Sequence, residues 1–264
     1  MSNVEKVTLQ SLDAKRFGHF LCYPKYTPEE LRNRVEELRR LGVTAIAFEG
    51  QRHIGDLRVL GKGHVGIVVK AFQNHESIAL KIRRIDADRR SMQHEMRMLQ
   101  IANKANAGPR FLDASKNFLL MEYVKGELLP EWLESHCVKD HREEVRHVLR
   151  LTLEQAWRLD EAGLDHGELS NAPRHIIVRA NSEPCLVDFE TASTSRRVSN
   201  VTSLGQYLLL AGATADLVRG VHSDIDEHRL VRALRNYKRE RNRENFLSVL
   251  VDSKIQRASM KTRA

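Results

Sequence analysis

A glycine-rich stretch followed by a lysine is the first feature of the chain that could do chemistry. Gly61, Gly63 and Gly66 have the GxGxxG spacing, and glycines let backbone amides approach a phosphate closely. The β-type residues 67–69 (IVV) follow at once, so a strand–turn–strand hairpin is expected rather than a helix. Lys81 closes the next apolar run, where its ammonium could hold the α- and β-phosphates of a nucleotide. The stretch predicts a phosphate clamp, and the alternative is an ordinary hairpin with one exposed lysine.

Two acidic motifs lie further along the chain. The run 166–170 (HGELS) follows a long predicted helix, and the run 188–190 (DFE) follows two short predicted strands. Carboxylate oxygens are ligands that magnesium accepts. Asp188, at the end of the second strand, is therefore a candidate metal ligand.

The order of these motifs resembles the protein-kinase-like superfamily over about residues 55–210. The motifs are GKGHVG, IALK, a helix glutamate, MEYVKG, DHGELS and VDFE. The HGELS run looks most like the HGDLS loop of RIO-type atypical kinases and of the kinase subunit of the KEOPS complex. The chain is also similar to a group of predicted archaeal serine/threonine kinases that carry an HGEL loop, a DFE motif and an NVTS stretch, here residues 200–203.

The resemblance implies a role for individual residues. Glu95, on a helix predicted over 88–103, would pair with Lys81 and hold it toward the phosphates. Glu168 would orient the phosphate acceptor, and Asp188 would bind magnesium. The implied catalytic residues are therefore Glu168, Lys81 and Glu95.

The predicted strand 118–124 would act as the hinge, whose backbone groups bind an adenine edge. ATP and Mg²⁺ are the implied cofactors. The expected nucleotide-binding residues are Gly61, Lys62, Gly63, Gly66, Val68, Ala79, Lys81, Glu122, Tyr123 and Val124.

Two departures from the family pattern leave the chemistry open. Glu168 stands where kinases have aspartate, and a misplacement of about 1 Å can cost on the order of a hundredfold in rate. This could slow transfer, or it could favour alignment of a water and ATP hydrolysis. Pro173 stands where asparagine is expected, five residues after the acid. Asn171 and His175 are the alternatives for a second metal ligand, although imidazole suits softer metals than magnesium.

The segment before the clamp is expected to be a small α/β extension. Thr27 begins a helix with a capping box, Gly42 can end it, and residues 43–48 follow as a strand. The extension is interpreted as a packing cap, with a recognition helix as the alternative. The exposed face of the helix is expected to mix charges: Arg32, Arg34, Arg39 and Arg40 with Glu29, Glu36 and Glu37.

The predicted fold is α+β: a bilobal protein-kinase-like fold with a small N-terminal extension and a reduced helical C-lobe. The expected parts are the extension (1–53), the N-lobe (54–124), the C-lobe (125–255) and a basic, disordered tail (256–264). Further helices are predicted over 141–162, 203–220, 225–237 and 245–255, and further strands over 175–179 and 185–189.

Composition sets bounds on the whole chain. A length of 264 residues with 41% hydrophobic content is enough for a packed core. The sequence shows neither a membrane-spanning run nor a signal peptide, so a cytoplasmic protein without membrane contact is expected. Cys22, Cys137 and Cys185 lack CxxC spacing, which argues against a disulfide framework or a zinc site. The net charge of +8 leaves an RNA or ribosomal partner open, because it attracts polyanions.

The predicted function is that of a phosphotransferase, an ATP-dependent atypical serine/threonine protein kinase or kinase-fold ATPase that acts on the γ-phosphate of Mg·ATP. The alternatives are a nucleotide-binding pseudokinase, an RNA- or ribosome-associated switch, and a small-molecule kinase, because the DFE motif also occurs in kinases of choline and aminoglycosides. The sequence does not identify the phosphate acceptor, which is a protein or a small molecule.

Overall fold

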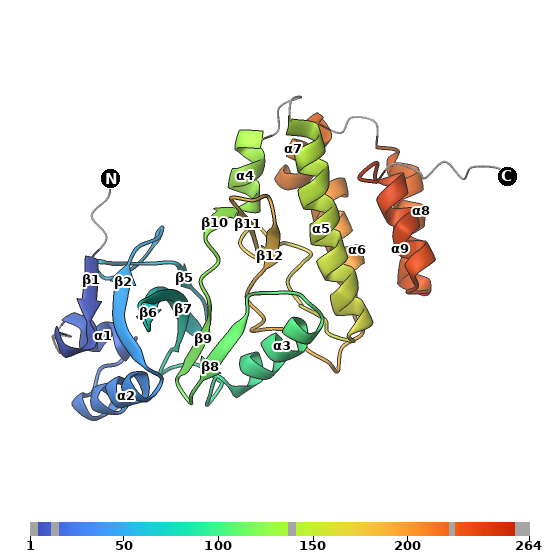
Figure 1. Ribbon diagram of the computed structural model, residues 1–264. Helices are drawn as coiled ribbons and strands as arrows, with labels where there is room; N and C mark the ends of the chain where they lie inside the picture. The colour runs from blue at the N-terminus through green and yellow to red at the C-terminus, as the bar shows by residue number, and fades with distance from the viewer. Residues whose placement is uncertain (1–4, 12–15, 137–140, 222–224, 257–264) are drawn as a thin grey trace. The chain divides into compact units, whose positions relative to one another are not determined.

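The computed structural model describes residues 5–11, 16–136, 141–221 and 225–256 (Figure 1). The chain divides into two compact units. Unit 1 contains Met1–Gln100 and Pro109–Tyr123, and unit 2 contains Ile101–Gly108 and Val124–Ala264. The prediction of an α+β fold is confirmed.

Unit 1 is built on an antiparallel sheet with the strand order β1-β2-β6-β7-β9-β8, in which β5 also pairs with β6. A separate hairpin joins β3 and β4. The strands are β1 (Glu5–Thr8), β2 (Val43–Phe48), β3 (Arg52–Ile54), β4 (Leu57–Val59), β5 (Gly61–Lys62), β6 (Gly66–Gln73), β7 (Glu76–Arg83), β8 (Phe111–Ala114) and β9 (Phe118–Glu122). The helices are the short 3-10 turn Leu9–Ser11, α1 (Arg16–Leu21), α2 (Pro28–Arg40) and most of α3 (Gln93–Lys104).

Helix α2 begins at the predicted N-cap Thr27, but the Glu30 carboxylate accepts from Arg34 Nε at 2.7 Å and does not complete the capping box. The Thr27 hydroxyl accepts a hydrogen bond from the Glu30 amide at 3.2 Å, and Gly42 follows the helix with a φ of +68°. The prediction that Arg34 and Glu37 lie on the exposed face of this helix is wrong. Arg34 is completely buried and Glu37 is half-buried, because Arg34 shares its face with Leu38 and finds polar partners on α1, on β7 and in the turn before β9.

The N-terminal segment shares the core of the sheet rather than lying apart from it. Phe17 stacks on Phe48 with ring centroids 5.4 Å apart, and Phe20 meets the same ring edge-on at 5.1 Å. These rings belong to one apolar cluster with residues of β6, β7 and β9, such as Leu80 and Phe118. β1, β2, α1 and α2 are therefore structural parts of unit 1 (Figure 1).

Unit 2 combines a small antiparallel sheet, β10-β11-β12, with helices. Its strands are β10 (Gly126–Leu128), β11 (Ile176–Arg179) and β12 (Pro184–Leu186). Its helical segments are α4 (Leu129–His136), α5 (Arg142–Glu161), α6 (Asn200–Gly205), the π-helical turn Gln206–Leu210, α7 (Ala213–Val221), α8 (Glu227–Arg239) and α9 (Arg243–Asp252). Among the helices described, none is long and apolar enough to cross a lipid bilayer.

Two sequence expectations need correction in unit 2. The helix predicted over 203–220 starts earlier, at Asn200, and is broken before α7, where Gly212 has a φ of +94°. The strand predicted over 185–189 ends at Leu186, because Asp188 has a φ of +69° that a strand cannot contain. The predicted tail lies outside the described residues except for Gln256.

The buried carboxylate of Asp160 ties three helices of unit 2 together. Its Oδ1 accepts from the Asn200 amide at 3.0 Å and from the Asn200 side chain at 2.9 Å. Its Oδ2 accepts from the Val201 amide at 3.2 Å and from the Tyr237 hydroxyl at 3.0 Å. Four donors from α6 and α8 thus satisfy an acid on α5, as a buried carboxylate requires.

We expect Tyr237→Phe to lower the free energy of unfolding by about 1–3 kcal/mol, because it removes one donor from this buried carboxylate. Tyr207→Phe is the matched control. The Tyr207 hydroxyl accepts from Thr214 at 2.9 Å, and the Thr214 hydroxyl can rotate to another acceptor. Urea unfolding measures both variants; a loss for Tyr237→Phe no larger than that for Tyr207→Phe would contradict the role of Asp160.

Candidate functional site

A buried ion pair lies at the centre of unit 1. Strand β7 carries Lys81 and helix α3 carries Glu95, and Lys81 Nζ lies 2.8 Å from Glu95 Oε1. Their side chains are only 3% and 4% exposed. Burial of two charges is costly unless they face one another, so the pair defines the position of the lysine ammonium closely.

The glycine-rich segment packs directly against the stem of this lysine. Residues 61–66 form the expected strand–turn–strand hairpin between β5 and β6, and the Gly63 amide donates to the Gly66 carbonyl at 2.8 Å. A Cβ atom at Gly66 would lie 3.0 Å from Lys81 Cγ and 3.1 Å from the Ile82 carbonyl oxygen. Gly66 therefore makes room for Lys81, while Lys62 and Gly63 are exposed.

The remaining predicted nucleotide contacts of unit 1 lie on neighbouring strands. Val68 on β6 is paired in register with Lys81, and Ala79 on β7 is paired with Met121 on β9. Val68 is half-buried and Ala79 is buried. Their small apolar side chains suit contact with a flat apolar ring.

The predicted hinge contains groups that are already bonded within unit 1. The Glu122 amide donates to the Arg110 carbonyl at 2.8 Å, which removes this amide from the groups that could bind adenine. The Tyr123 hydroxyl donates to Glu49 at 2.9 Å. Burial, together with the Glu49 carboxylate, raises the pKa of Tyr123 to about 12. Val124 is the first residue of unit 2 after the hinge.

In unit 2 the HGELS run forms a tight loop held by backbone contacts. Gly167 has a φ of +92°, and a Cβ atom there would lie 2.8 Å from Thr191 Oγ1, so only glycine fits without strain. The Thr191 hydroxyl donates to the His166 carbonyl at 3.1 Å. Asp165 and Ser193 exchange two backbone hydrogen bonds of 2.9 and 2.8 Å. The loop is thereby fastened to the segment that follows the DFE motif.

Asn200 positions the same loop from the other side. Its Oδ1 accepts from the His166 amide at 2.9 Å, and its Nδ2 donates to the Leu164 carbonyl at 2.7 Å. Sequence reasoning noticed the NVTS stretch only as a family resemblance and gave Asn200 no role. Its role could not be predicted, because the helix was expected to begin only at residue 203 and the partners of Asn200 come together only in the folded chain.

Glu168 lies against His175. His175 Nε2 is 2.9 Å from Glu168 Oε2, and the side chains are 14% and 36% exposed. Because a carboxylate accepts, His175 Nε2 carries the hydrogen of this contact, and its Nδ1 is buried. This Nδ1 has no hydrogen-bond partner among the residues described. His175 thus orients the acid of the HGELS run.

The predicted metal-binding residues occupy different surroundings in unit 2. Asp188 is half-buried and has the left-handed φ of +69°, a conformation that is rare outside glycine and asparagine and often marks functional sites. Asn171 is exposed. The roles of Asp188, Asn171 and His175 in metal binding remain predictions.

His166 is fully buried and fixed as a neutral ring. Its Nε2 donates to the Val187 carbonyl at 3.1 Å, and its rings contact His175 and Phe189, with centroids 5.7 and 4.9 Å away. Burial lowers the pKa of His166 to about 4, and the proximity of His175 also lowers it. The folded loop therefore favours the neutral form of the His166 ring.

We expect the stability of the protein to fall on acidification because of His166. The unfolded chain binds a proton near pH 6.5, whereas the folded chain does so only near pH 4. Stability is therefore complete above pH 6.5 and is lost as the pH falls toward 4, by about 2 kcal/mol between pH 7.5 and 5.

Urea unfolding of the metal-free protein at both pH values tests this expectation. His166→Gln keeps a donor for Val187 but cannot titrate, so its loss between pH 7.5 and 5 should be smaller. The control is His228→Gln, at an exposed position of α8. An acid-induced loss in His166→Gln equal to that of the unchanged protein would refute the assignment.

The family comparison agrees with this arrangement. The model of the RIO domain matches residues 69–201, which include Lys81, Glu95, Glu168 and Asp188. The match begins after the glycine-rich segment and leaves out the N-terminal extension. The curated proteins compared with the chain give no match. Because the family model covers half of the chain, the chain belongs to the RIO domain family, whose members are atypical protein-kinase-like proteins.

Proposed function

We propose that this chain binds Mg·ATP and acts on its γ-phosphate as an atypical serine/threonine protein kinase, or as an ATPase if water is the acceptor. The observation that carries the proposal is the buried Lys81–Glu95 ion pair beside the glycine hairpin. An ammonium held by a buried carboxylate, next to a glycine hairpin in which Gly66 packs closely against the lysine stem, is suited to nucleotide phosphates.

The residues present fit both ATP and magnesium. Gly66 leaves no room for a side chain beside Lys81, and the ammonium of the exposed Lys62 would bind phosphate oxygens. Asp188 would hold magnesium, because a hard cation prefers carboxylate oxygen. Bound magnesium would neutralise charge on the phosphates.

Glu168 would orient the acceptor hydroxyl or water. The contact with His175 keeps the longer glutamate side chain in a defined direction, which compensates in part for its extra methylene. His175 would then be a positioning residue for Glu168 rather than a ligand of magnesium, since imidazole suits softer metals.

An RNA-binding switch is less well supported than phosphate chemistry. Besides the net charge, a dense basic run that could contact a phosphate backbone contains Lys238, Arg239, Arg241 and Arg243. Arg241 donates to the Val198 carbonyl at 3.0 Å, and the Arg243 guanidinium lies 4.4 Å from the centre of the Trp157 ring. These two arginines are therefore engaged in packing within unit 2.

Binding of ATP tests the first half of the proposal. Lys81→Met would leave a buried carboxylate without the cation that faces it, so the charge-balanced double variant K81M/E95Q is preferable. We expect this variant to bind ATP at least about tenfold more weakly in calorimetry, because a charge-assisted phosphate contact is lost. Lys104→Met, at an exposed position of α3, is the control. Equal affinity in K81M/E95Q and the unchanged protein would exclude the phosphate role.

Measurement of turnover tests the second half of the proposal, that the chain acts on the γ-phosphate. With γ-labelled ATP and magnesium, labelled protein and free phosphate are followed together. We expect Glu168→Gln to lower either product by about a hundredfold or more at unchanged ATP affinity, as loss of an acid–base group does. Asp188→Asn should lose turnover as well, and Glu161→Gln, exposed on α5, should not. Full turnover in Glu168→Gln would remove this residue from the mechanism.

A further inference from the structure

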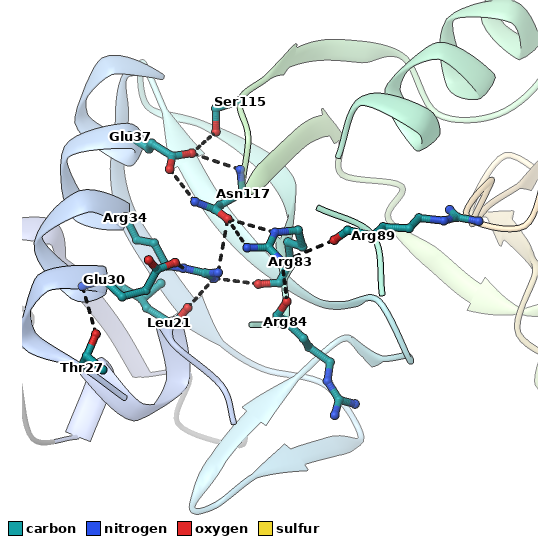
Figure 2. Close-up of polar contacts among 10 residues, drawn as sticks. All are labelled: Leu21, Thr27, Glu30, Arg34, Glu37, Arg83, Arg84, Arg89, Ser115 and Asn117. Atoms are coloured by element: carbon teal, nitrogen blue, oxygen red, sulfur yellow. Dashed lines mark hydrogen bonds and ion pairs between the residues drawn. The ribbon is translucent and has the colours of Figure 1, made fainter. Parts of the chain in front are cut away.

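Arg34 is a charged side chain with no exposure to solvent on a helix of the N-terminal extension. Its Nε donates to Glu30 on the same helix at 2.7 Å. One terminal nitrogen donates to two carbonyls, that of Leu21 at 2.7 Å and that of Arg83 at 2.6 Å (Figure 2). A guanidinium so fully engaged fixes the distances between the elements that it joins.

The contact with Arg83 reaches the strand that carries the phosphate-binding lysine. Arg83 is the last residue of β7, two positions after Lys81. Its own guanidinium donates to Asn117 Oδ1 at 3.0 and 2.8 Å, and the same oxygen accepts from Arg34 at 3.3 Å. Its other terminal nitrogen donates to the carbonyls of Arg84 and Arg89, at 3.0 and 3.4 Å, in the connection from β7 to α3 (Figure 2).

Glu37, three residues after Arg34, is linked through a turn to the start of the helix that carries Glu95. Its Oε2 accepts from the Ser115 hydroxyl at 2.6 Å and the Asn117 amide at 3.1 Å, and its Oε1 accepts from Asn117 Nδ2 at 2.5 Å. The turn that these contacts fix also accepts the Met92 amide, through the Lys116 carbonyl, at 3.1 Å. Glu95 lies three residues after Met92, so Glu37 anchors the beginning of the helix that carries it.

Tyr23 connects the extension to the glycine hairpin as well. Its carbonyl accepts from the Ile85 amide at 2.9 Å. Its ring lies 4.9 Å from Lys62 Nζ and 5.1 Å from the Arg84 guanidinium. Arg84 in turn donates to the Gly63 carbonyl at 3.1 Å, so the hairpin is tied to the end of β7.

The four charges of this network balance one another. Burial lowers the pKa of Arg83 and the charge of Arg34 lowers it further, whereas Glu30 and Glu37 raise it. Removal of one member therefore leaves buried charge uncompensated and displaces its partners.

We propose that Arg34 and Glu37 are positioning residues for the phosphate contacts of Lys81, Glu95 and the glycine hairpin. The inference rests on the proposed function, since it concerns the same nucleotide site. The extension lies outside the segment that matches the RIO domain, so this role belongs to the chain's own N-terminal residues.

The test compares ATP with adenosine, because only ATP reports the phosphate contacts. Arg34→Met keeps an apolar stem but removes the donors, and Glu37→Gln keeps the shape while it removes the charge and presents a donor to Ser115 or Asn117. The matched controls on the exposed face of α2 are Arg32→Met and Glu36→Gln. Circular dichroism verifies the fold of each variant, and calorimetry gives both affinities.

We expect Arg34→Met and Glu37→Gln to bind ATP about tenfold more weakly, with adenosine affinity changed less than about twofold. In the K81M/E95Q background, Arg34→Met should weaken ATP binding less than it does in the unchanged protein, because the Lys81 contact that it positions is already absent. If Arg34→Met does not fold, the ATP and adenosine affinities of Glu37→Gln test the inference alone.

Wild-type affinity for ATP in a folded Glu37→Gln would overturn the inference, and so would an equal loss of ATP and adenosine binding. These outcomes differ from failure of the proposed function. If that function is wrong, the unchanged protein does not bind ATP or K81M/E95Q binds it equally well, and the inference falls with it.

Discussion

The structure of unit 1 depends on the electrostatic constraint that a buried ammonium must face a buried carboxylate. Lys81 and Glu95 come from a strand and a helix that are separated by a long connection, and their side chains meet in the interior. Such a pair tolerates little displacement, because its attraction must offset the cost of removing two charges from water. The connection, the glycine hairpin and the turn 115–117 are each fastened by hydrogen bonds, and this fastening makes the pair possible.

Unit 2 must also hold a functional side chain in place, and there a network of buried hydrogen bonds holds the loop that carries it. The HGELS loop has to hold Glu168 in place although its backbone turns sharply at Gly167. Asn200, which Asp160 holds in place, accepts from the His166 amide of the loop, and His166 remains neutral in the apolar interior. Both units therefore hold a functional side chain, the buried Lys81 in unit 1 and the half-buried Glu168 in unit 2, with the help of hydrogen-bonded buried polar residues, as a site that requires precise orientation does.

Local signals in the sequence were sufficient for the main elements and for the motif residues. The N-cap at Thr27, the glycine spacing and the apolar periodicity of α5 each depend on neighbours in the chain, so they can be read directly. Arg34 could not be placed in the same way. Hydropathy assigns an arginine to the surface, and its acceptors at Leu21, Arg83 and Asn117 come together only in the folded sheet. The pairing of Glu168 with His175 was missed for the same reason, since a loop determines it rather than a repeating pattern.

The pairing of β2 with β6 also affects how the protein behaves toward other molecules of its kind. Strand β6 is long and rich in β-branched residues, and without β2 its unpaired amides and carbonyls would form an open template for another chain. Strand β2 of the extension pairs with this edge of β6. The edge of the sheet is then β1, a strand of only four residues that carries Glu5 and Lys6. Short, charged edge strands resist sheet-to-sheet association. The N-terminal segment thus protects the molecule against aggregation at the border of its principal sheet.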